Sequence, residues 1–320
     1  MDNAAAASLD PWAIAHAAAR AIGTFDAERP ARFALTTAGD LCRLAGRDPA
    51  AVLQWDPAAG WQSALTADDP RGDLLGLYLP ISSATLARPI TIGHLGQSLD
   101  GFIATQSGDA CSVTGPENIL HLHRLRALCD AVVVGAGTVA ADNPRLTTRL
   151  VAGSNPLRVI LDPVCRLPAA HTVFNDGAAP TLRVCAAGTP AVAQARARGE
   201  DVLEVAACAG ALDLADLLRQ LRALGCSRIF VEGGGVTVSS FLQADLLDRL
   251  HIAIAPLLIG EGRPAIRMPP RLRLQDCLRL RHRVYRAGDD ILFDCDLRAA
   301  TTGSAGAHGS FPAGPLQRVL

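Results

Sequence analysis

Two glycine-rich turns are the parts of this chain whose residue types and spacing could do chemistry. Residues 135–144 follow an apolar run, and residues 231–235, Val-Glu-Gly-Gly-Gly, follow another. Glycine lets the backbone approach a phosphate closely, and the first N–H groups of a following helix are donors with positive potential. In α/β proteins such ligands bind where strands end. Two such turns predict a dinucleotide cofactor facing a phosphorylated substrate.

The first turn offers Gly135, Gly137 and the Thr138 hydroxyl to a pyrophosphate, although two glycines after a strand are also typical of a plain turn. The three glycines of residues 233–235 exceed what a tight turn needs, and Ser239 follows in the first turns of the next expected helix. Their spacing is not G-x-G-x-x-G. An ordinary Rossmann dehydrogenase is therefore disfavoured.

Arginine is the basic residue available for phosphate, because none of the 30 basic side chains is a lysine. This excludes a Schiff-base nucleophile, a pyridoxal-phosphate anchor and a P-loop. Arg126 and Arg149 are candidates, since a guanidinium fork matches a phosphate well. Either could instead be a solvated surface charge. We also expect Arg158, at the start of a strand, to meet a cofactor 2′-phosphate, with surface exposure as its alternative.

The composition is that of a globular protein with a sizeable core, 49% hydrophobic and 19% charged. The net charge of −1 gives no reason to expect nucleic acid or an anionic membrane as a partner. The sequence lacks a signal peptide and an apolar run of ~20 residues, so we expect a cytoplasmic protein. The nine scattered cysteines form no C-x-x-C pair, which predicts reduced thiols, no zinc and no zinc-dependent deaminase.

Hydrophobic periodicity predicts an α/β fold with a mostly parallel central sheet flanked by helices and an antiparallel edge. The expected strands are 74–81, 90–95, 131–135, 157–162, 181–185, 228–232, 250–255 and the closing pair 284–285 and 291–295. The expected helices are 12–22, 116–128, 190–197, 212–224 and 236–244. Residues 1–88 form an N-terminal extension without a chemical motif, 89–299 the main domain, and 300–320 a disordered tail.

Several segments between residues 89 and about 297 resemble the reductase domain of riboflavin-biosynthesis proteins, the RibD C-terminal family. They are Ser98-Leu99-Asp100-Gly101, His123-Arg124-Leu125-Arg126-Ala127, Asp130-Ala131 with the block 135–149, Arg158-Val159-Ile160-Leu161-Asp162, Val231-Glu232-Gly233-Gly234, and Ala255-Pro256 with Gly260. The resemblance implies a dihydrofolate-reductase-like fold, NADPH as hydride donor and a homodimer. It also implies reduction of the ribosyl group of a phosphoribosylaminopyrimidine, a small-molecule substrate, to a ribityl chain.

The resemblance also implies roles for individual residues. Cofactor contacts are implied at Gly96, Thr138, Asp142 and the turn that contains Gly233, Gly234, Gly235 and Ser239. Substrate contacts are implied at Arg126, Leu146, Arg149 and Glu232, with the two arginines on the phosphate. Asp142 or Glu232 could relay a proton to the opened sugar, and the sequence leaves that choice open.

Three departures bear on the substrate. His94 stands where the family often has Lys, Ala110 and Ser112 replace a Ser and an aromatic residue, and residues 1–88 replace a deaminase domain. The chain is interpreted as a reductase of 5-amino-6-(5-phosphoribosylamino)uracil or its diaminopyrimidine analogue. One alternative is a same-fold reductase of another pterin-like or pyrimidine substrate in secondary metabolism. The other is an idle nucleotide-binding subunit, which would not need Arg126, Asp142, Arg149 and Glu232 together.

Overall fold

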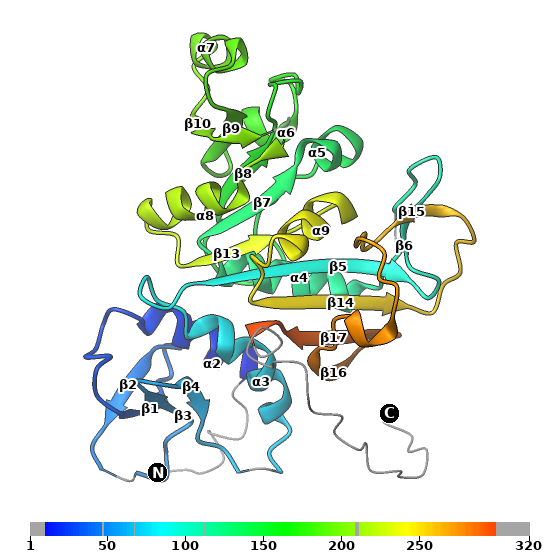
Figure 1. The fold of residues 1–320 in the computed structure, drawn as a ribbon. Helices are drawn as coiled ribbons and strands as arrows, with labels where there is room; N and C mark the ends of the chain where they lie inside the picture. Colours follow the sequence, from blue (N-terminus) through cyan, green and yellow to red (C-terminus); the bar gives the residue numbers. More distant parts are fainter. Residues whose placement is uncertain (1–9, 47, 67, 112, 209–210, 299–320) are drawn as a thin grey trace.

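The computed structural model describes residues 10–298, apart from residues 47, 67, 112 and 209–210 (Figure 1). The predicted disordered tail from residue 300 therefore lies outside the described residues. The chain from residue 89 onward is arranged around a nine-stranded sheet, and residues 10–88, here called the N-terminal unit, pack against one face of it. The expected α/β class and the mostly parallel sheet are confirmed.

The central sheet has the strand order β10-β9-β8-β7-β13-β5-β14-β17-β16. Neighbouring strands from β10 to β14 run parallel, and β17 and β16 close the sheet with antiparallel pairing, as the sequence predicted. The strands are β5 (Ile90–Ser98), β7 (Ala131–Gly135), β8 (Leu157–Leu161), β9 (Thr181–Ala186), β10 (Val202–Val205), β13 (Arg228–Val231), β14 (Arg249–Ala255), β16 (Arg281–Ala287) and β17 (Asp290–Asp296).

Two hydrophobic cores lie on the two faces of this sheet, because successive side chains of a strand point to opposite faces. Val132 and Val134 of β7 join the core beneath the N-terminal unit, whereas Ala131 and Val133 join the opposite core. Helices α4 (Pro116–Leu128), α5 (Ala136–Asp142) and α6 (Thr172–Asn175) contribute to the first core. Helices α8 (Leu214–Ala223) and α9 (Gly235–Gln243) contribute to the second.

The remaining elements are short. Helix α7 (Pro190–Ala197) packs on β9 and β10, and a 3₁₀ turn covers Leu274–Asp276. Strands β6 (Phe102–Thr105) and β15 (Gly262–Pro264) pair as a ribbon beside the ends of β5 and β14 (Figure 1), and β11 (Ala207–Cys208) pairs with β12 (Ala211–Leu212). The described part of the chain has no helix long and apolar enough to cross a membrane.

The N-terminal unit combines two helices with a four-stranded antiparallel sheet of order β2-β1-β3-β4. Its elements are α2 (Pro11–Ala21), β1 (Ala31–Leu35), β2 (Leu41–Leu44), β3 (Leu53–Asp56), β4 (Gly60–Ser63) and α3 (Arg71–Ser82). The strand expected at 74–81 is wrong, because these residues belong to α3. Leu75, Leu77, Tyr78, Leu79 and Ile81 are all buried, and a helix buried on most sides has the same continuous apolar run as a buried strand.

Arg228 at the start of β13 attaches the N-terminal unit to the central sheet. Its guanidinium donates to the carbonyl oxygens of Ala19, Ile81, Ser82 and Ala84 at 3.2–3.3 Å. These carbonyls lie at or just beyond the C-terminal ends of α2 and α3, where helices leave acceptors unpaired and favour positive charge. One buried cation thus satisfies the ends of two helices.

Candidate functional site

A cavity of about 830 Å³ opens at the carboxyl ends of β5, β7, β8 and β13. The ribbon of β6 and β15 forms one wall, and residues of α4, α5 and α9 form others. This is the position at which parallel α/β sheets bind ligands. Of the residues expected to bind cofactor or substrate, the cavity wall contains Gly96, Gly135, Gly137, Thr138, Asp142, Glu232, Gly233, Gly234 and Gly235.

The turn between β13 and α9 is shaped by two glycines, Gly233 and Gly235. Gly233 has φ +110°, a conformation that residues with a Cβ rarely adopt. A Cβ on Gly235 would lie 2.0 Å from the carbonyl oxygen of Ala265, so the turn presses directly on the neighbouring backbone. The Thr138 hydroxyl accepts a 2.9 Å hydrogen bond from the Gly234 N–H and joins the two predicted turns.

Helices α5 and α9 both begin at the cavity with a glycine N-cap, Gly135 and Gly234, and neither has a side-chain capping hydrogen bond. The first N–H groups of a helix have no partner within it. Two uncapped N-termini at one cavity therefore provide donors and positive potential suited to anionic groups.

Glu232 lies on the cavity wall and is held by Arg126 from α4. Arg126 Nε and Nη2 donate to the two carboxylate oxygens at 2.9 and 2.5 Å, and Nη1 lies 3.3 Å from the Thr147 carbonyl oxygen. The guanidinium is almost fully buried and all three of its nitrogens have acceptors. The expectation that Arg126 clamps a phosphate is not supported by this arrangement, in which Arg126 orients Glu232.

Arg149 lies beside this pair on the segment that follows α5 and, like Arg126, is not a residue of the cavity wall. Its Nη1 donates to the Thr147 hydroxyl at 2.7 Å, and its backbone N–H donates to His123 Nδ1 at 2.9 Å. Partial burial, followed by the charges of Arg126 and Arg145, lowers the pKa of Arg149. Several positive charges therefore gather here, and an anion would relieve their repulsion. Leu146, expected to contact substrate, is buried next to this segment with φ +54° and is absent from the cavity wall.

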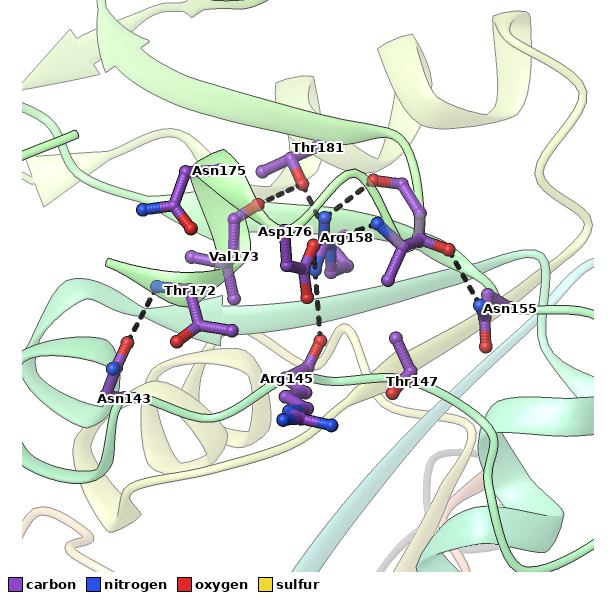
Figure 2. A network of polar contacts seen from close by, with 12 residues as sticks. Asn143, Arg145, Thr147, Asn155, Arg158, Thr172, Val173, Asn175, Asp176 and Thr181 are labelled. Carbon is purple, nitrogen blue, oxygen red and sulfur yellow. Dashed lines mark hydrogen bonds and ion pairs between the residues drawn. The ribbon is translucent and has the colours of Figure 1, made fainter. Parts of the chain in front are cut away.

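Arg158 on β8 belongs to a buried polar network and not to the cavity wall (Figure 2). It donates to Thr181 Oγ1 at 2.8 Å and to the carbonyls of Ala179 and Arg145 at 2.6 and 3.2 Å, and it pairs with Asp176 at 2.9 Å. Only 1% of the Arg158 surface is exposed. This burial does not favour the expected contact with a cofactor phosphate. Arg158 holds the backbone at Arg145, and thereby the segment that contains Arg149.

Three arginines that the sequence interpretation overlooked do line the cavity: Arg166 after β8, Arg263 on β15 and Arg267 beyond it. Arg166 lies close to the N-terminus of α5, since its Nη2 is the nearest atom to a Cβ built on Gly137, at 3.9 Å. Their positions depend on loops that carry no recognisable motif. Only the rule that ligands bind at strand ends could have indicated Arg166.

Asp142 at the end of α5 remains a candidate acid. Desolvation beside the cavity raises the pKa of its carboxyl group, and the Arg263 charge partly opposes the rise. Ser239 is different, since it is buried and its hydroxyl accepts from the Arg267 N–H at 2.8 Å. The neighbouring Ser240 lies on the cavity wall instead.

His94 on β5 lies on the cavity wall and is neutral. Its Nε2 faces the Asn118 amide oxygen at 2.9 Å, so Nε2 carries the hydrogen. Burial, followed by the charge of His251, lowers the pKa of His94 to about 3. The residue that replaces the family's lysine therefore adds no positive charge here. In the described part of the chain, no cluster of three or more His, Cys, Asp or Glu side chains could hold a metal ion.

Comparisons with known proteins show the family of this chain. The model of the RibD C-terminal domain family matches residues 89–291. The 2,5-diamino-6-ribosylamino-4(3H)-pyrimidinone 5′-phosphate reductase of Methanothermobacter thermautotrophicus is 36% identical over 214 residues, which cover 65% of this chain and 97% of that protein. The riboflavin biosynthesis protein RibD of Aquifex aeolicus is 35% identical, over 56% of this chain and 49% of that protein.

Solved structures share the fold. The deaminase/5-amino-6-(5-phosphoribosylamino)uracil reductase of Thermotoga maritima superposes with a TM-score of 0.55 and 25% identity over 71% of this chain and 60% of that chain. The riboflavin biosynthesis reductase Rib7 of Saccharomyces cerevisiae gives a TM-score of 0.51 and 21% identity, over 65% and 89% of the two chains. The chain therefore spans about half to two thirds of the two-activity proteins and most of the shorter reductases.

Proposed function

This chain belongs to the RibD C-terminal domain family, and on that basis we propose that it is an NADPH-dependent reductase of a phosphoribosylaminopyrimidine. The observation that carries the proposal is the single cavity wall shared by two uncapped helix N-termini and by Glu232, which Arg126 orients. In the proposed reaction the ribosyl group becomes a ribityl chain, as the resemblance implies.

The cavity residues fit a nicotinamide dinucleotide. The N-termini of α5 and α9 could receive a pyrophosphate, because both helices begin at the cavity wall without a side-chain cap. We assign the 2′-phosphate to Arg166 and not to Arg158, since Arg166 lines the cavity next to the start of α5. When bound, the nicotinamide would supply the hydride.

The substrate phosphate is assigned to Arg149, with Arg145 nearby. Arg149 has donors left over after its bond to Thr147, whereas Arg126 has an acceptor for each nitrogen. Glu232 is the residue that would hold the pyrimidine or sugar, because it is the carboxylate that Arg126 fixes at the cavity wall. Such orientation of a polar group keeps the reacting atoms close.

Reduction of the sugar carbon also requires a proton at the sugar oxygen. Asp142 is the better candidate donor, since desolvation beside the cavity raises the pKa of its carboxyl group. Glu232 is less suited to donate, because both of its carboxylate oxygens already accept hydrogen bonds from Arg126.

The test is the loss of NADPH absorbance with the phosphoribosylamino-uracil and with its diaminopyrimidinone analogue. Dihydrofolate and the dephosphorylated nucleoside serve as comparison substrates. Turnover of a phosphorylated pyrimidine alone supports the proposal, and turnover of a different pterin-like substrate would favour the secondary-metabolism alternative. NADPH binding without turnover of any substrate would indicate the idle subunit.

We also propose that the enzyme is a homodimer, as the resemblance implies. The segment between β14 and β16 exposes Leu258, Leu272 and Leu274, with 70%, 99% and 80% of their surfaces accessible. Large exposed apolar side chains gathered on one segment are typical of a protein interface. A second copy of this chain is the partner proposed for this segment.

A further inference from the structure

Two cysteines face each other beside the cavity. Cys165 lies in the turn that follows β8, Cys185 lies in β9, and their sulfur atoms are 2.9 Å apart. A disulfide bond is about 2.05 Å long, so the two atoms would have to approach by less than about 1 Å to be joined. Cys185 is fully buried, whereas part of Cys165 reaches solvent. The pair is free in the structure described here.

The backbone conformation of the turn places the Cys165 thiol next to Cys185 of β9. Cys165 has φ +51°, a left-handed conformation that is unfavourable for a residue with a Cβ and persists only when the surroundings enforce it. The enforcing group is Asp162, whose carbonyl accepts from the Cys165 N–H at 3.0 Å. Its carboxylate accepts from the N–H groups of Arg166 and Leu167, each at 3.0 Å, and is paired with the buried Arg183.

The same turn forms part of the cavity wall. Val164 and Arg166, the residues on either side of Cys165, both line the cavity, and Cys165 does not. The thiol instead contacts the carbonyl oxygen of Ala191 on α7 at 3.3 Å, and Ala191 is not a residue of the cavity wall. A movement of Cys165 towards β9 would therefore move two cavity residues with it.

We propose that Cys165 and Cys185 form a reversible dithiol–disulfide pair that a small hydroperoxide oxidises, and that the disulfide draws the 162–167 turn towards β9 and weakens cofactor binding. The second half of this inference rests on the proposed function, because it takes the cavity to be the NADPH site. The first half stands on the cysteine geometry alone.

The chemistry needs only the two thiols and the hydroperoxide. The Cys165 thiolate attacks the terminal peroxide oxygen, the O–O bond breaks, and the products are a Cys165 sulfenic acid and water or an alcohol. The Cys185 thiolate then attacks the Cys165 sulfur, the S–S bond forms and the S–O bond breaks, and water leaves. In total the thiols lose two electrons and two protons, and the peroxide is reduced.

Cys165 must react first because it is the sulfur that solvent reaches. Burial and the contact with Cys165 raise the pKa of Cys185 well above the ordinary thiol value. The second step is therefore the slow one, and it should accelerate as pH rises. A small peroxide suits the first step better than a bulky disulfide, because Cys165 is only partly exposed.

The absence of lysine gives a sharp test for the bond. Trypsin cuts this chain only after arginine, so the two cysteines fall in separate short peptides, residues 159–166 and 184–196, each with one cysteine. Full-length protein is treated with hydrogen peroxide, remaining thiols are blocked, and the digest is analysed by mass spectrometry. We expect these two peptides joined with the loss of two hydrogens, and separated again by dithiothreitol.

Cysteine substitutions test which thiols form the cross-link. Cys165→Ala and Cys185→Ala should both abolish the joined peptide, and Cys277→Ala, which removes an exposed thiol of another segment, should leave it intact. Failure to detect the joined peptide in the wild type, with Cys165 recovered as a sulfinic or sulfonic acid, would overturn the proposal. A 159–166 peptide joined in the wild type to a cysteine peptide other than 184–196 would overturn the assignment of the partner.

Two measurements test the coupling to the cavity. Oxidation should weaken NADPH binding at least about threefold in the wild type and leave it unchanged in Cys185→Ala. It should also slow hydrogen exchange at the Arg166 and Leu167 amides, because the disulfide ties the turn to β9. Unchanged affinity and unchanged exchange in cross-linked protein would overturn the coupling. If neither form binds NADPH, the proposed function fails, while the cross-link and the exchange rates still decide this inference.

Discussion

The hydroxyl of Tyr78 lies 2.7 Å from Nδ1 of His121. This contact connects helix α3 of the N-terminal unit to helix α4, which packs on the central sheet. The chain continues inside the protein, because His121 Nε2 lies 3.0 Å from His251 Nδ1, and His251 Nε2 lies 3.2 Å from the Asp294 carboxylate. Burial lowers the pKa of His121 well below its ordinary value and keeps its ring neutral, so one ring nitrogen carries the hydrogen and the other accepts. With the hydrogen on Nε2, the Tyr78 hydroxyl is the donor to Nδ1.

Tyr78→Phe should lower the free energy of unfolding by about 1–3 kcal/mol, since it leaves a buried His121 acceptor without a donor. Urea unfolding followed by tryptophan fluorescence measures the change. Tyr285→Phe is the matched control, because Tyr285 is only partly buried and should change stability by less than about 0.5 kcal/mol. Equal effects of the two variants would show that the Tyr78 hydroxyl is not a buried donor.

Stability should fall as pH falls below about 6.5. Burial lowers the pKa of His94 to about 3 and that of His121 well below its ordinary value. Between these values and 6.5 the unfolded chain binds protons that the folded protein does not, so acid favours unfolding by about 1.4 kcal/mol per pH unit for each group. Urea midpoints at several pH values measure this slope. His94→Gln should reduce it, and an unchanged slope in that variant would contradict the prediction.

Arg149→Ala should raise the KM for the phosphorylated substrate. Loss of a charge-assisted contact of about 1.5–3 kcal/mol corresponds to roughly a 10- to 150-fold increase, with NADPH affinity nearly unchanged. Arg149→Lys should recover part of the loss, since lysine offers a point charge and no fork. Arg29→Ala, which removes an exposed arginine of the N-terminal unit, is the control. Wild-type kinetics in Arg149→Ala, or equal turnover of the dephosphorylated substrate, would contradict the assignment.

Arg166→Ala should reduce the preference for NADPH over NADH. A lost contact to the 2′-phosphate would weaken NADPH binding roughly 10- to 150-fold and leave NADH binding almost unchanged. Arg158→Ala should give the opposite pattern, with stability lowered by roughly 3 kcal/mol and cofactor preference intact, because it breaks a buried ion pair. Titration of both cofactors and thermal unfolding distinguish the two. A loss of preference in Arg158→Ala alone would restore the original expectation.

Leu272→Glu combined with Leu274→Glu should produce a monomer, because charges placed in an apolar interface lose their hydration. Light scattering during size-exclusion chromatography gives the mass directly. Leu224→Glu is the control, since Leu224 is also exposed, at 60%, but lies at the end of α8. A wild-type chain that is already monomeric would contradict the homodimer proposal.

The sequence predicted the elements with clear terminal signals well. Helices 116–128 and 190–197 begin at Pro and match α4 and α7 at both ends, because proline at the first turn is a start signal. The small sheet of the N-terminal unit gave no such signal. Its strands β2, β3 and β4 have only four residues each, too few for an alternating pattern to be distinguished from a loop.

The residues of the candidate site also differ in how well the sequence predicted them. The glycine turns were found because their backbone conformation restricts the residue type, and they do line the cavity. The arginines were harder to interpret, because their roles depend on partners distant in sequence. Arg126 pairs with Glu232, which lies 106 residues away, and no local pattern indicates that such a guanidinium is already occupied. Arg166 was missed for the converse reason, since it borders the cavity without a motif.

The attachment of the N-terminal unit through Arg228 has a consequence for how the chain unfolds. The four carbonyls that receive this guanidinium all belong to the N-terminal unit, while Arg228 belongs to a central strand between β7 and β5. Separating the two parts would leave the buried Arg228 cation without its acceptors, and it would also expose one face of the sheet to solvent. Neither part can melt early without destabilising the other, so the two should behave as a single cooperative unit with one shared transition.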